Sequence, residues 1–127
     1  MEVKAKLSNY RMAPRKARKV VDLVRGKKAG EAMAILSFTV NKTARPVLKL
    51  LNSAIDSAKK NLKIDASNLF ISKITVDEGP KMKRWHPMSR GRAYPIEKRT
   101  SHIQIVLSEI TPKETKKPKV KTTKTKK

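Results

Sequence analysis

The residues best suited to bind a charged partner lie in one segment, Lys81 to Arg99. Seven of its nineteen positions are Lys or Arg and its only acid is Glu97; the seven are Lys81, Lys83, Arg84, Arg90, Arg92, Lys98 and Arg99. Trp85, His86 and Tyr94 are interleaved with these cations. Guanidinium groups bind phosphates through a flat fork of donors, and aromatic rings stack on unpaired bases. The pattern is typical of a nucleic-acid-binding segment.

Individual residues of this segment leave alternatives open. Trp85 could stack on a base, or it could anchor the start of the segment in a core. His86 is expected to be exposed or to stack on a base. Gly91, between Arg90 and Arg92, would let the backbone bend sharply and come close to a partner. His102 is expected to lie in a strand and to contact a partner.

The sequence contains no residues arranged for catalysis. Asp77 and Glu78 are the only adjacent acids, and neighbours in a strand point to opposite faces, so they cannot share a proton. The chain has two histidines and no cysteine, which gives no metal-ligand cluster. Its four glycines form no phosphate-binding loop. We therefore expect no catalytic residue, metal, cofactor or small-molecule substrate, and no enzyme.

The overall charge agrees with a polyanionic partner. The chain has 127 residues, with 32 Lys and Arg against 10 Asp and Glu, and so a formal charge of +22. Each contact between a basic side chain and a nucleic-acid phosphate releases counterions, which favours binding. Nucleic acid is therefore the favoured partner, and an anionic membrane surface is the weaker alternative. No apolar run is long enough to span a membrane or to form a signal peptide, and there are no cysteines for disulfides. We expect a cytosolic protein with one domain.

Elements that could position these residues follow from hydrophobic periodicity. The sequence predicts three helices, over residues 14–25, from 29 or 30 to 38, and from about 44 to 61. Thr43 is the favoured cap of the third helix, with a kinked start nearer Asn41 as the alternative. The exposed face of the first helix carries Arg15, Arg18, Lys19 and Arg25. This face could contact phosphates or be an ordinary solvated surface.

Strands are predicted over residues 2–7, 69–76 and 102–110. The connection between the last two is too long for an ordinary loop, so we expect a ribbon that projects into solvent. Pro87 and Pro95 would interrupt a regular ladder, and an irregular arm suits folded RNA better than the major groove of DNA. Residues 111–127 contain many lysines and no aromatic residue, which predicts a disordered basic tail.

The run GPKMKRWHPMSRGRAYPIEKRTSHIQIVL, residues 79–107, closely resembles the signature region of the twenty-second family of bacterial large-subunit ribosomal proteins. The matching positions are a Lys-Arg pair at Lys83 and Arg84, then Pro87, then Gly91 to Ala93, and finally Lys98 to Ile103. The segments RMAPRKARKVVDLVRG and LNSAIDSAKKN are also similar to the family. The resemblance covers nearly all of residues 1–110.

This resemblance implies an α+β fold with three helices on a small three-stranded antiparallel sheet and a long β-hairpin at about residues 77–101. It implies that the protein binds ribosomal RNA, organises several RNA domains during assembly, and helps line the nascent-peptide exit tunnel with a hairpin tip around Pro87 to Ala93. Its partners would be ribosomal RNA, neighbouring ribosomal proteins and the nascent polypeptide, and it would be a monomer outside the cytoplasmic ribosome. The expected RNA-binding residues are Arg11, Arg15, Lys16, Arg18, Lys19, Lys81, Lys83, Arg84, Trp85, His86, Arg90, Gly91, Arg92, Lys98, Arg99, Thr100, Ser101 and His102.

The chain departs from the family pattern at Met88 and Ser89, where the family usually has Arg-Ala, and so one tip arginine is missing. Pro46 is unusual within the third helix, and the lysine tail has no assigned counterpart. Two other classes of function remain open on the residues alone. One is a dimeric architectural DNA-binding protein with a basic β-arm in the minor groove. The other is an enzyme acting on RNA, with His86 or Glu97 in its site.

Overall fold

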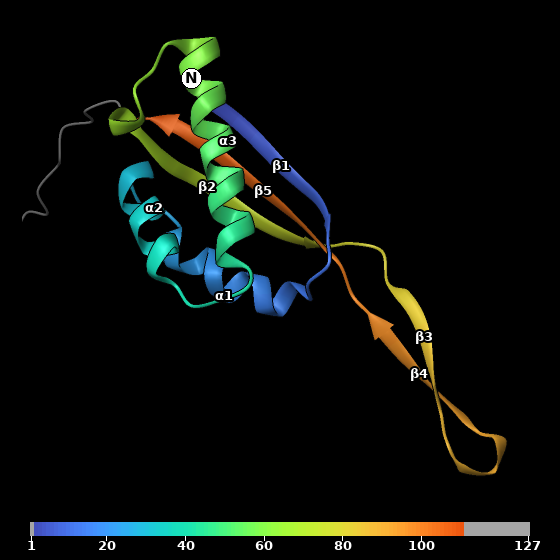
Figure 1. Ribbon diagram of the computed structural model, residues 1–127. Helices are drawn as coiled ribbons and strands as arrows, with labels where there is room; N and C mark the ends of the chain where they lie inside the picture. The colour runs from blue at the N-terminus through green and yellow to red at the C-terminus, as the bar shows by residue number, and fades with distance from the viewer. Residues whose placement is uncertain (1, 111–127) are drawn as a thin grey trace, which may run out of the picture.

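A computed structural model describes residues 2–110 of the chain, and the predicted basic tail, residues 111–127, lies outside them. Three helices cover one face of a three-stranded sheet, and a two-stranded hairpin extends from one corner of that sheet (Figure 1). The predicted α+β architecture is confirmed. The elements follow the chain in the order β1 (Glu2–Tyr10), α1 (Pro14–Val24), α2 (Ala29–Phe38), α3 (Ala44–Leu62), β2 (Leu69–Glu78), β3 (Met82–Pro87), β4 (Ala93–Lys98) and β5 (Ser101–Glu109), with a short 3₁₀ turn before β2 and a tight turn between β3 and β4.

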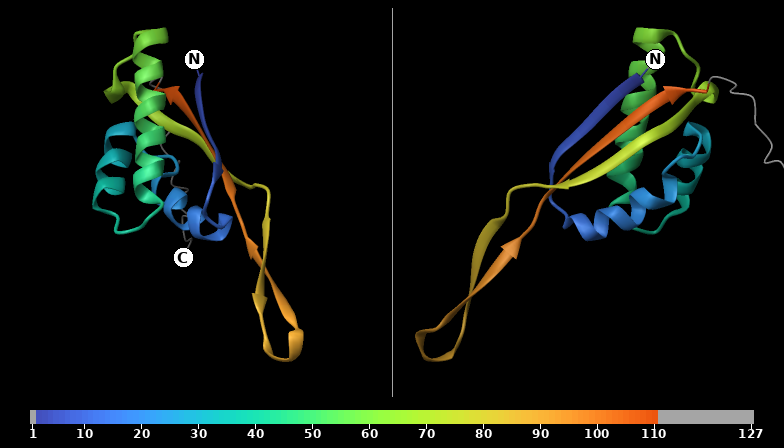
Figure 2. Two further views of the ribbon diagram at one scale, coloured as in Figure 1. Left: turned by 45° about the vertical axis from the view of Figure 1, so that its right-hand side comes forward. Right: turned by 180° about the vertical axis from the view of Figure 1, so that it is seen from behind.

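The sheet has the strand order β1–β5–β2, with both pairings antiparallel. Its strands are Glu2–Tyr10 (β1), Leu69–Glu78 (β2) and Ser101–Glu109 (β5). Each is longer at one end than the sequence predicts, except β5, which is displaced by one residue. The central strand β5 places Ile103, Ile105 and Leu107 fully in the core. Seen from behind, the opposite face of the sheet has no helix of residues 2–110 in front of it (Figure 2).

The helices are Pro14–Val24 (α1), Ala29–Phe38 (α2) and Ala44–Leu62 (α3). In α3 the buried residues Val47, Leu51, Ala54 and Ala58 recur at helical spacing, which lays one stripe against the sheet. Pro14 occupies the first position of α1, where a missing amide costs nothing. Gly26, just beyond the end of α1, has a φ of +71°. These positions agree with the roles that the sequence predicts for them.

The start of α3 differs in one detail from the prediction. Thr43 does occupy the position before the helix, but its hydroxyl is buried and has no hydrogen-bond partner among the described residues. The neighbouring side chain of Asn41 accepts the Thr43 amide instead, at 2.9 Å. Pro46 is the third residue of α3, within the first turn, where helix amides have no intrahelical partner. The proline is therefore accommodated without a kink at this end.

Candidate nucleic-acid interface

The hairpin that carries most of the predicted binding residues is a regular two-stranded ribbon, and we call residues 79–100 the arm. Strand β3 (Met82–Pro87) pairs with β4 (Ala93–Lys98) in six successive pairs without a register shift. The pair of Glu78 with Ser101 is the last pair of the main sheet before the arm. The arm therefore begins two residues later and ends one residue earlier than the hairpin limits expected from the sequence.

The two prolines do not interrupt this ladder, which corrects the expectation of an irregular arm. Pro95 lies opposite Trp85, and Pro87 lies opposite Ala93. The Met88 amide donates to the Arg92 carbonyl at 2.8 Å, so Met88 and Arg92 form a hydrogen-bonded pair. Hydrogen-bonded and non-hydrogen-bonded pairs alternate along an antiparallel ladder. The pair of Pro87 with Ala93 and the pair of Trp85 with Pro95 are therefore both non-hydrogen-bonded. Their missing amides point outward, where no ladder bond is lost.

The tip of the arm is a tight turn over Ser89 to Arg92. The Arg92 amide donates to the Ser89 carbonyl at 3.4 Å, and the two central residues, Arg90 and Gly91, have φ values of +56° and +68°. Positive φ at both central positions is the requirement of a type I′ turn, whose twist matches that of the flanking strands. The bend predicted at Gly91 is present, and Arg90 shares it although arginine rarely adopts this conformation. The tip thus holds a guanidinium group on a sharply turned backbone.

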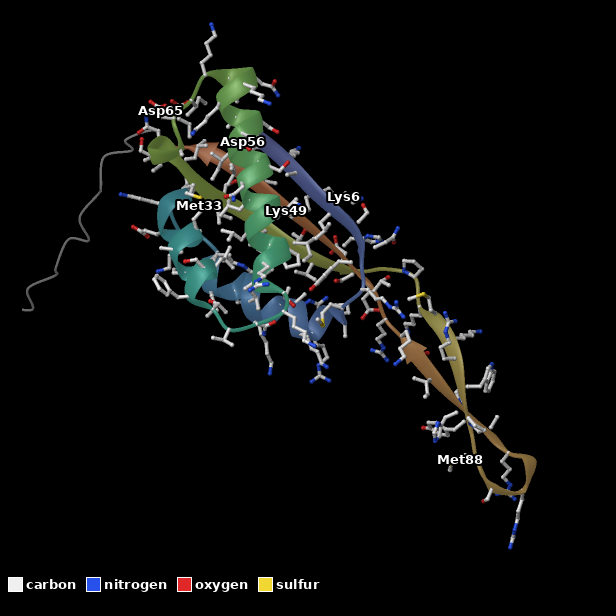
Figure 3. All side chains as sticks on the ribbon, in the orientation of Figure 1. Lys6, Met33, Lys49, Asp56, Asp65 and Met88 are labelled. Atoms are coloured by element: carbon white, nitrogen blue, oxygen red, sulfur yellow. The ribbon has the colours of Figure 1, made fainter. Side chains whose placement is uncertain are left out.

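Most side chains along the arm are exposed. Trp85 and Tyr94 each expose 65% of their surface, and Met88, near the far end of the arm, exposes 57% (Figure 3). This exposure excludes the alternative that Trp85 anchors the arm in a core. The predicted cations of the arm are also exposed, and they are Lys81, Lys83, Arg84, Arg90, Arg92, Lys98 and Arg99.

The single acid of the arm holds two cations at its base. The Glu97 carboxylate lies 3.2 Å from the Arg99 guanidinium and 3.5 Å from the Lys81 ammonium. All three side chains are almost half exposed, so the pairs contribute little to stability. They do hold Lys81 and Arg99 on the same side of the ribbon as Glu97. Arg84 follows Lys83 in β3 and therefore lies on the opposite side of the ribbon from Glu97. Its guanidinium donates to the Lys83 carbonyl at 2.8 Å.

Two of the predicted binding residues lie inside the protein. Thr100 is 5% exposed and its hydroxyl donates to the Pro80 carbonyl at 2.7 Å, while Ser101 is fully buried. The Gly79 amide also donates to the Thr100 carbonyl at 3.0 Å. A Cβ on Gly79 would overlap with the Thr100 hydroxyl, so glycine allows the two strands to approach here. These residues fasten the base of the arm to the sheet.

His102 also has a role within the fold. Its Nδ1 accepts the backbone amide of Asn9 at 3.0 Å, and Asn9 adopts a φ of +55° where the pairing of β1 with β5 shifts register. The ring is half-buried and lies beside the start of the arm. An accepting Nδ1 carries no proton, and the Nε2 atom is therefore the donor side of this imidazole.

The predicted cations of α1 and the turn before it divide into two groups. Arg18 donates from Nη2 and Nε to the Val76 carbonyl, at 3.1 and 3.4 Å, and so joins α1 to β2. All five are exposed, but the side chains of the other four make no hydrogen bond or ion pair with another described residue, and they are Arg11, Arg15, Lys16 and Lys19. The structure therefore presents a second cationic surface on the body, which begins at Arg11, next to the pair of Tyr10 with Ser101 at the base of the arm.

A third set of cations was not predicted from the sequence. Lys4, Lys6 and Lys73 are exposed on the sheet face that no described helix covers, where Lys6 is opposite Gln104. Figure 3 labels Lys6 on β1. The alternation of Lys4 and Lys6 with apolar residues is the signal that could have identified them, because it places both on the solvent face of a half-buried strand. Glu2 and Asp77 line the same shallow hollow as Lys4 and Lys73, which reduces its net charge.

Within residues 2–110, no helix is long and apolar enough to cross a membrane, and no cluster of three His, Asp or Glu side chains could hold a metal ion. The features that mark the candidate interface are its positive charge, its exposed rings and its projecting shape. An RNA-binding protein of α+β fold with a protruding basic hairpin is the class that these features describe.

Residues 5–108 match the protein family described as ribosomal protein L22p/L17e. This match covers most of the chain, and the chain belongs to that family. It is accordingly a structural protein of the large ribosomal subunit that binds ribosomal RNA and contacts other ribosomal proteins in the cytoplasmic ribosome. The family assignment confirms the resemblance noted in the sequence and favours RNA over the alternative of duplex DNA.

Proposed function

We propose that this protein organises more than one domain of large-subunit ribosomal RNA during assembly, and that the tip of its arm helps line the exit tunnel for nascent polypeptides. The observation that carries the proposal is the shape of the arm, a two-stranded ribbon with exposed cations that projects from a separately packed body (Figure 1). A projecting ribbon can reach between RNA segments that the body cannot contact. Residues 1–110 would act as a single domain, monomeric outside the ribosome.

The proposed RNA contacts use both cationic surfaces. The arm contributes its seven cations with Trp85, His86, Tyr94 and Gly91, and α1 with the preceding turn contributes Arg11, Arg15, Lys16 and Lys19. Arg18 and His102 could add contacts at the edge of the interface, although each also makes a hydrogen bond within the fold. Thr100 and Ser101 are left out because their buried hydroxyls cannot reach a partner.

Photo-cross-linking in assembled ribosomes tests the tunnel part of the proposal. A photoreactive amino acid replaces Met88 near the tip in one variant and Lys49 in the other, and each ribosome carries a radiolabelled stalled nascent chain. Lys49 lies on α3, on the body and far from the tip (Figure 3). We expect cross-links to the nascent chain from position 88 and none from position 49. Equal labelling at the two positions, or none at either, would contradict a tunnel-lining tip.

A further inference from the structure

The register of the arm sorts its side chains onto two unlike faces. Successive residues of a strand point to opposite sides, so directly paired residues share a face and alternate pairs share the same face. His86 with Tyr94 and Arg84 with Ile96 therefore lie on one side, and Trp85 with Pro95 lies on the other. The hydrogen bond from Met88 to Arg92 extends the pairing and adds Arg92 to the first side. We call the two sides the cationic face (Met82, Arg84, His86, Met88, Arg92, Tyr94, Ile96, Lys98) and the proline face (Lys83, Trp85, Pro87, Ala93, Pro95, Glu97).

The two faces differ in charge. The cationic face has three permanent cations distributed from the base of the arm to its tip, and no acid. The side of the proline face holds the only acid of the arm, Glu97, and its three cations, Lys81, Lys83 and Arg99, all lie at the base, where Lys81 and Arg99 are within ion-pair distance of Glu97. Beyond Lys83, toward the tip, every paired residue of the proline face is uncharged. A phosphate backbone is therefore attracted to the cationic face along its whole length, and to the proline face only near the base.

The aromatic side chains fit the same division. Tyr94 exposes 65% of its surface and lies directly opposite His86, with Arg84 on one side of this pair and Arg92 on the other. Rings between two guanidinium groups can stack an unpaired base while the adjacent phosphates bind to arginine. Trp85, by contrast, is opposite Pro95 in a non-hydrogen-bonded pair, the class in which side chains come closest together.

We propose that ribosomal RNA binds to the arm on one side only, the cationic face, as a single-stranded segment with a base stacked on Tyr94 and its phosphates bound to Arg84 and Arg92. The inference depends on the proposed RNA-binding role of the arm. It goes further, since it assigns the contacts to one face and removes the residues of the opposite side, Lys81, Lys83, Trp85 and Arg99, from the RNA contact set.

Two matched pairs of variants of the full chain test this assignment, with binding to deproteinised large-subunit RNA measured over a range of salt concentrations. Arg84→Gln and Lys83→Gln each remove one cation at neighbouring positions on opposite faces. Tyr94→Ala and Trp85→Ala each remove one exposed ring, also on opposite faces. Tyr94→Phe keeps the ring and serves as the conservative control. The four substituted positions all lie on the arm outside the core, and circular dichroism checks that each of the five variants is folded.

We expect Tyr94→Ala to weaken binding by about tenfold, in the range found for loss of a base-stacking ring, and Tyr94→Phe to bind like the parent. Arg84→Gln should reduce the slope of log K against log salt by about 0.7 to 0.9, the value for one phosphate contact. Lys83→Gln and Trp85→Ala should each change affinity by less than about twofold, a difference below 0.5 kcal/mol.

Three other outcomes would overturn the assignment. If the two members of each pair weaken binding equally, RNA surrounds the arm on both faces, and the proposed role of the arm stands without the face assignment. If only the variants on the proline face weaken binding, the faces are reversed. If no variant weakens binding, the arm is not an RNA-binding element, and the proposed function of the arm is lost as well.

The fluorescence of Trp85, the only tryptophan of the chain, gives a second readout. Stacking of a base on an indole ring quenches its emission. We expect saturation with a short oligouridine to leave most of the Trp85 emission, because the indole lies on the face opposite to the bound strand. Strong quenching in the parent chain that persists in Tyr94→Ala would contradict the proposal.

Discussion

At the scale of single residues, the contacts at the base of the arm decide which side chains are available to a partner. Thr100 and Ser101 belong to the sequence motif shared with the family, yet both lie inside the fold. Gly79 is required at this point by the closeness of Thr100, which a sequence cannot reveal, because the contact joins residues from two strands. A residue of the family motif can therefore fix the position of the arm without contacting RNA.

Substitution of Gly79 by alanine should destabilise the base of the arm. The added Cβ would overlap with the Thr100 hydroxyl and would also approach His102 Nε2 to 3.2 Å. Overpacking of this kind costs about 1–3 kcal/mol. We expect thermal unfolding to show a lower free energy of unfolding for Gly79→Ala, and a smaller loss when the substitution is made in a Thr100→Ala background.

Gly30→Ala is the control for this prediction. Gly30 lies in α2, and a Cβ there would meet no atom within 4 Å. Alanine is the better helix former by about 0.5–1 kcal/mol, so Gly30→Ala should leave stability unchanged or raise it. Equal destabilisation by the two substitutions would refute the role given to Gly79.

At the scale of elements, hydrophobic periodicity predicted the three helices and three sheet strands, because each buries one regular stripe of side chains. The long helix α3 is the clearest case, with Val47, Leu51 and Ala58 on its buried side. The regularity of the arm could not be predicted in the same way. Whether Pro87 and Pro95 break a ladder depends on the class of pair that each occupies, and this class is fixed only by the turn between them.

Helix α1 also shows why the candidate site was only partly predictable. Its cations look alike in the sequence, but their partners differ. Both side chains are exposed, but the Arg18 guanidinium donates to the Val76 carbonyl of β2, whereas the Arg15 guanidinium makes no hydrogen bond to another residue within residues 2–110. The distinction depends on which end of β2 lies beside α1, and this is a tertiary feature.

Arg18→Ala should lower the free energy of unfolding by about 1 kcal/mol, the typical net value of a hydrogen bond, because it removes a connection between α1 and β2. Arg15→Ala should leave unfolding unchanged and weaken RNA binding at low salt. Urea denaturation and filter binding of the two variants provide the comparison. An unchanged unfolding midpoint for Arg18→Ala would show that its bonds to β2 do not contribute to stability.

At the scale of the whole molecule, the body and the arm have separate physical roles. Apolar burial stabilises the body, in which Leu51, Ile71 and Ile105 are fully buried. The arm has an exposed surface and a high density of cations, and it therefore contributes little to the free energy of unfolding of the chain without RNA. Stability and RNA affinity should therefore respond to different sets of substitutions.

The most direct test of this division compares Arg84→Ala/Arg90→Ala/Arg92→Ala in the arm with Leu51→Ala in the core. For each variant, thermal unfolding and salt-dependent binding to deproteinised large-subunit RNA are measured. We predict that the arm variant unfolds like the parent but binds weakly, with a flatter salt dependence. Leu51→Ala should lose about 2–5 kcal/mol of stability and, below its unfolding transition, bind like the parent. An arm variant that unfolds early, or that binds RNA with the parental salt dependence, would contradict the account.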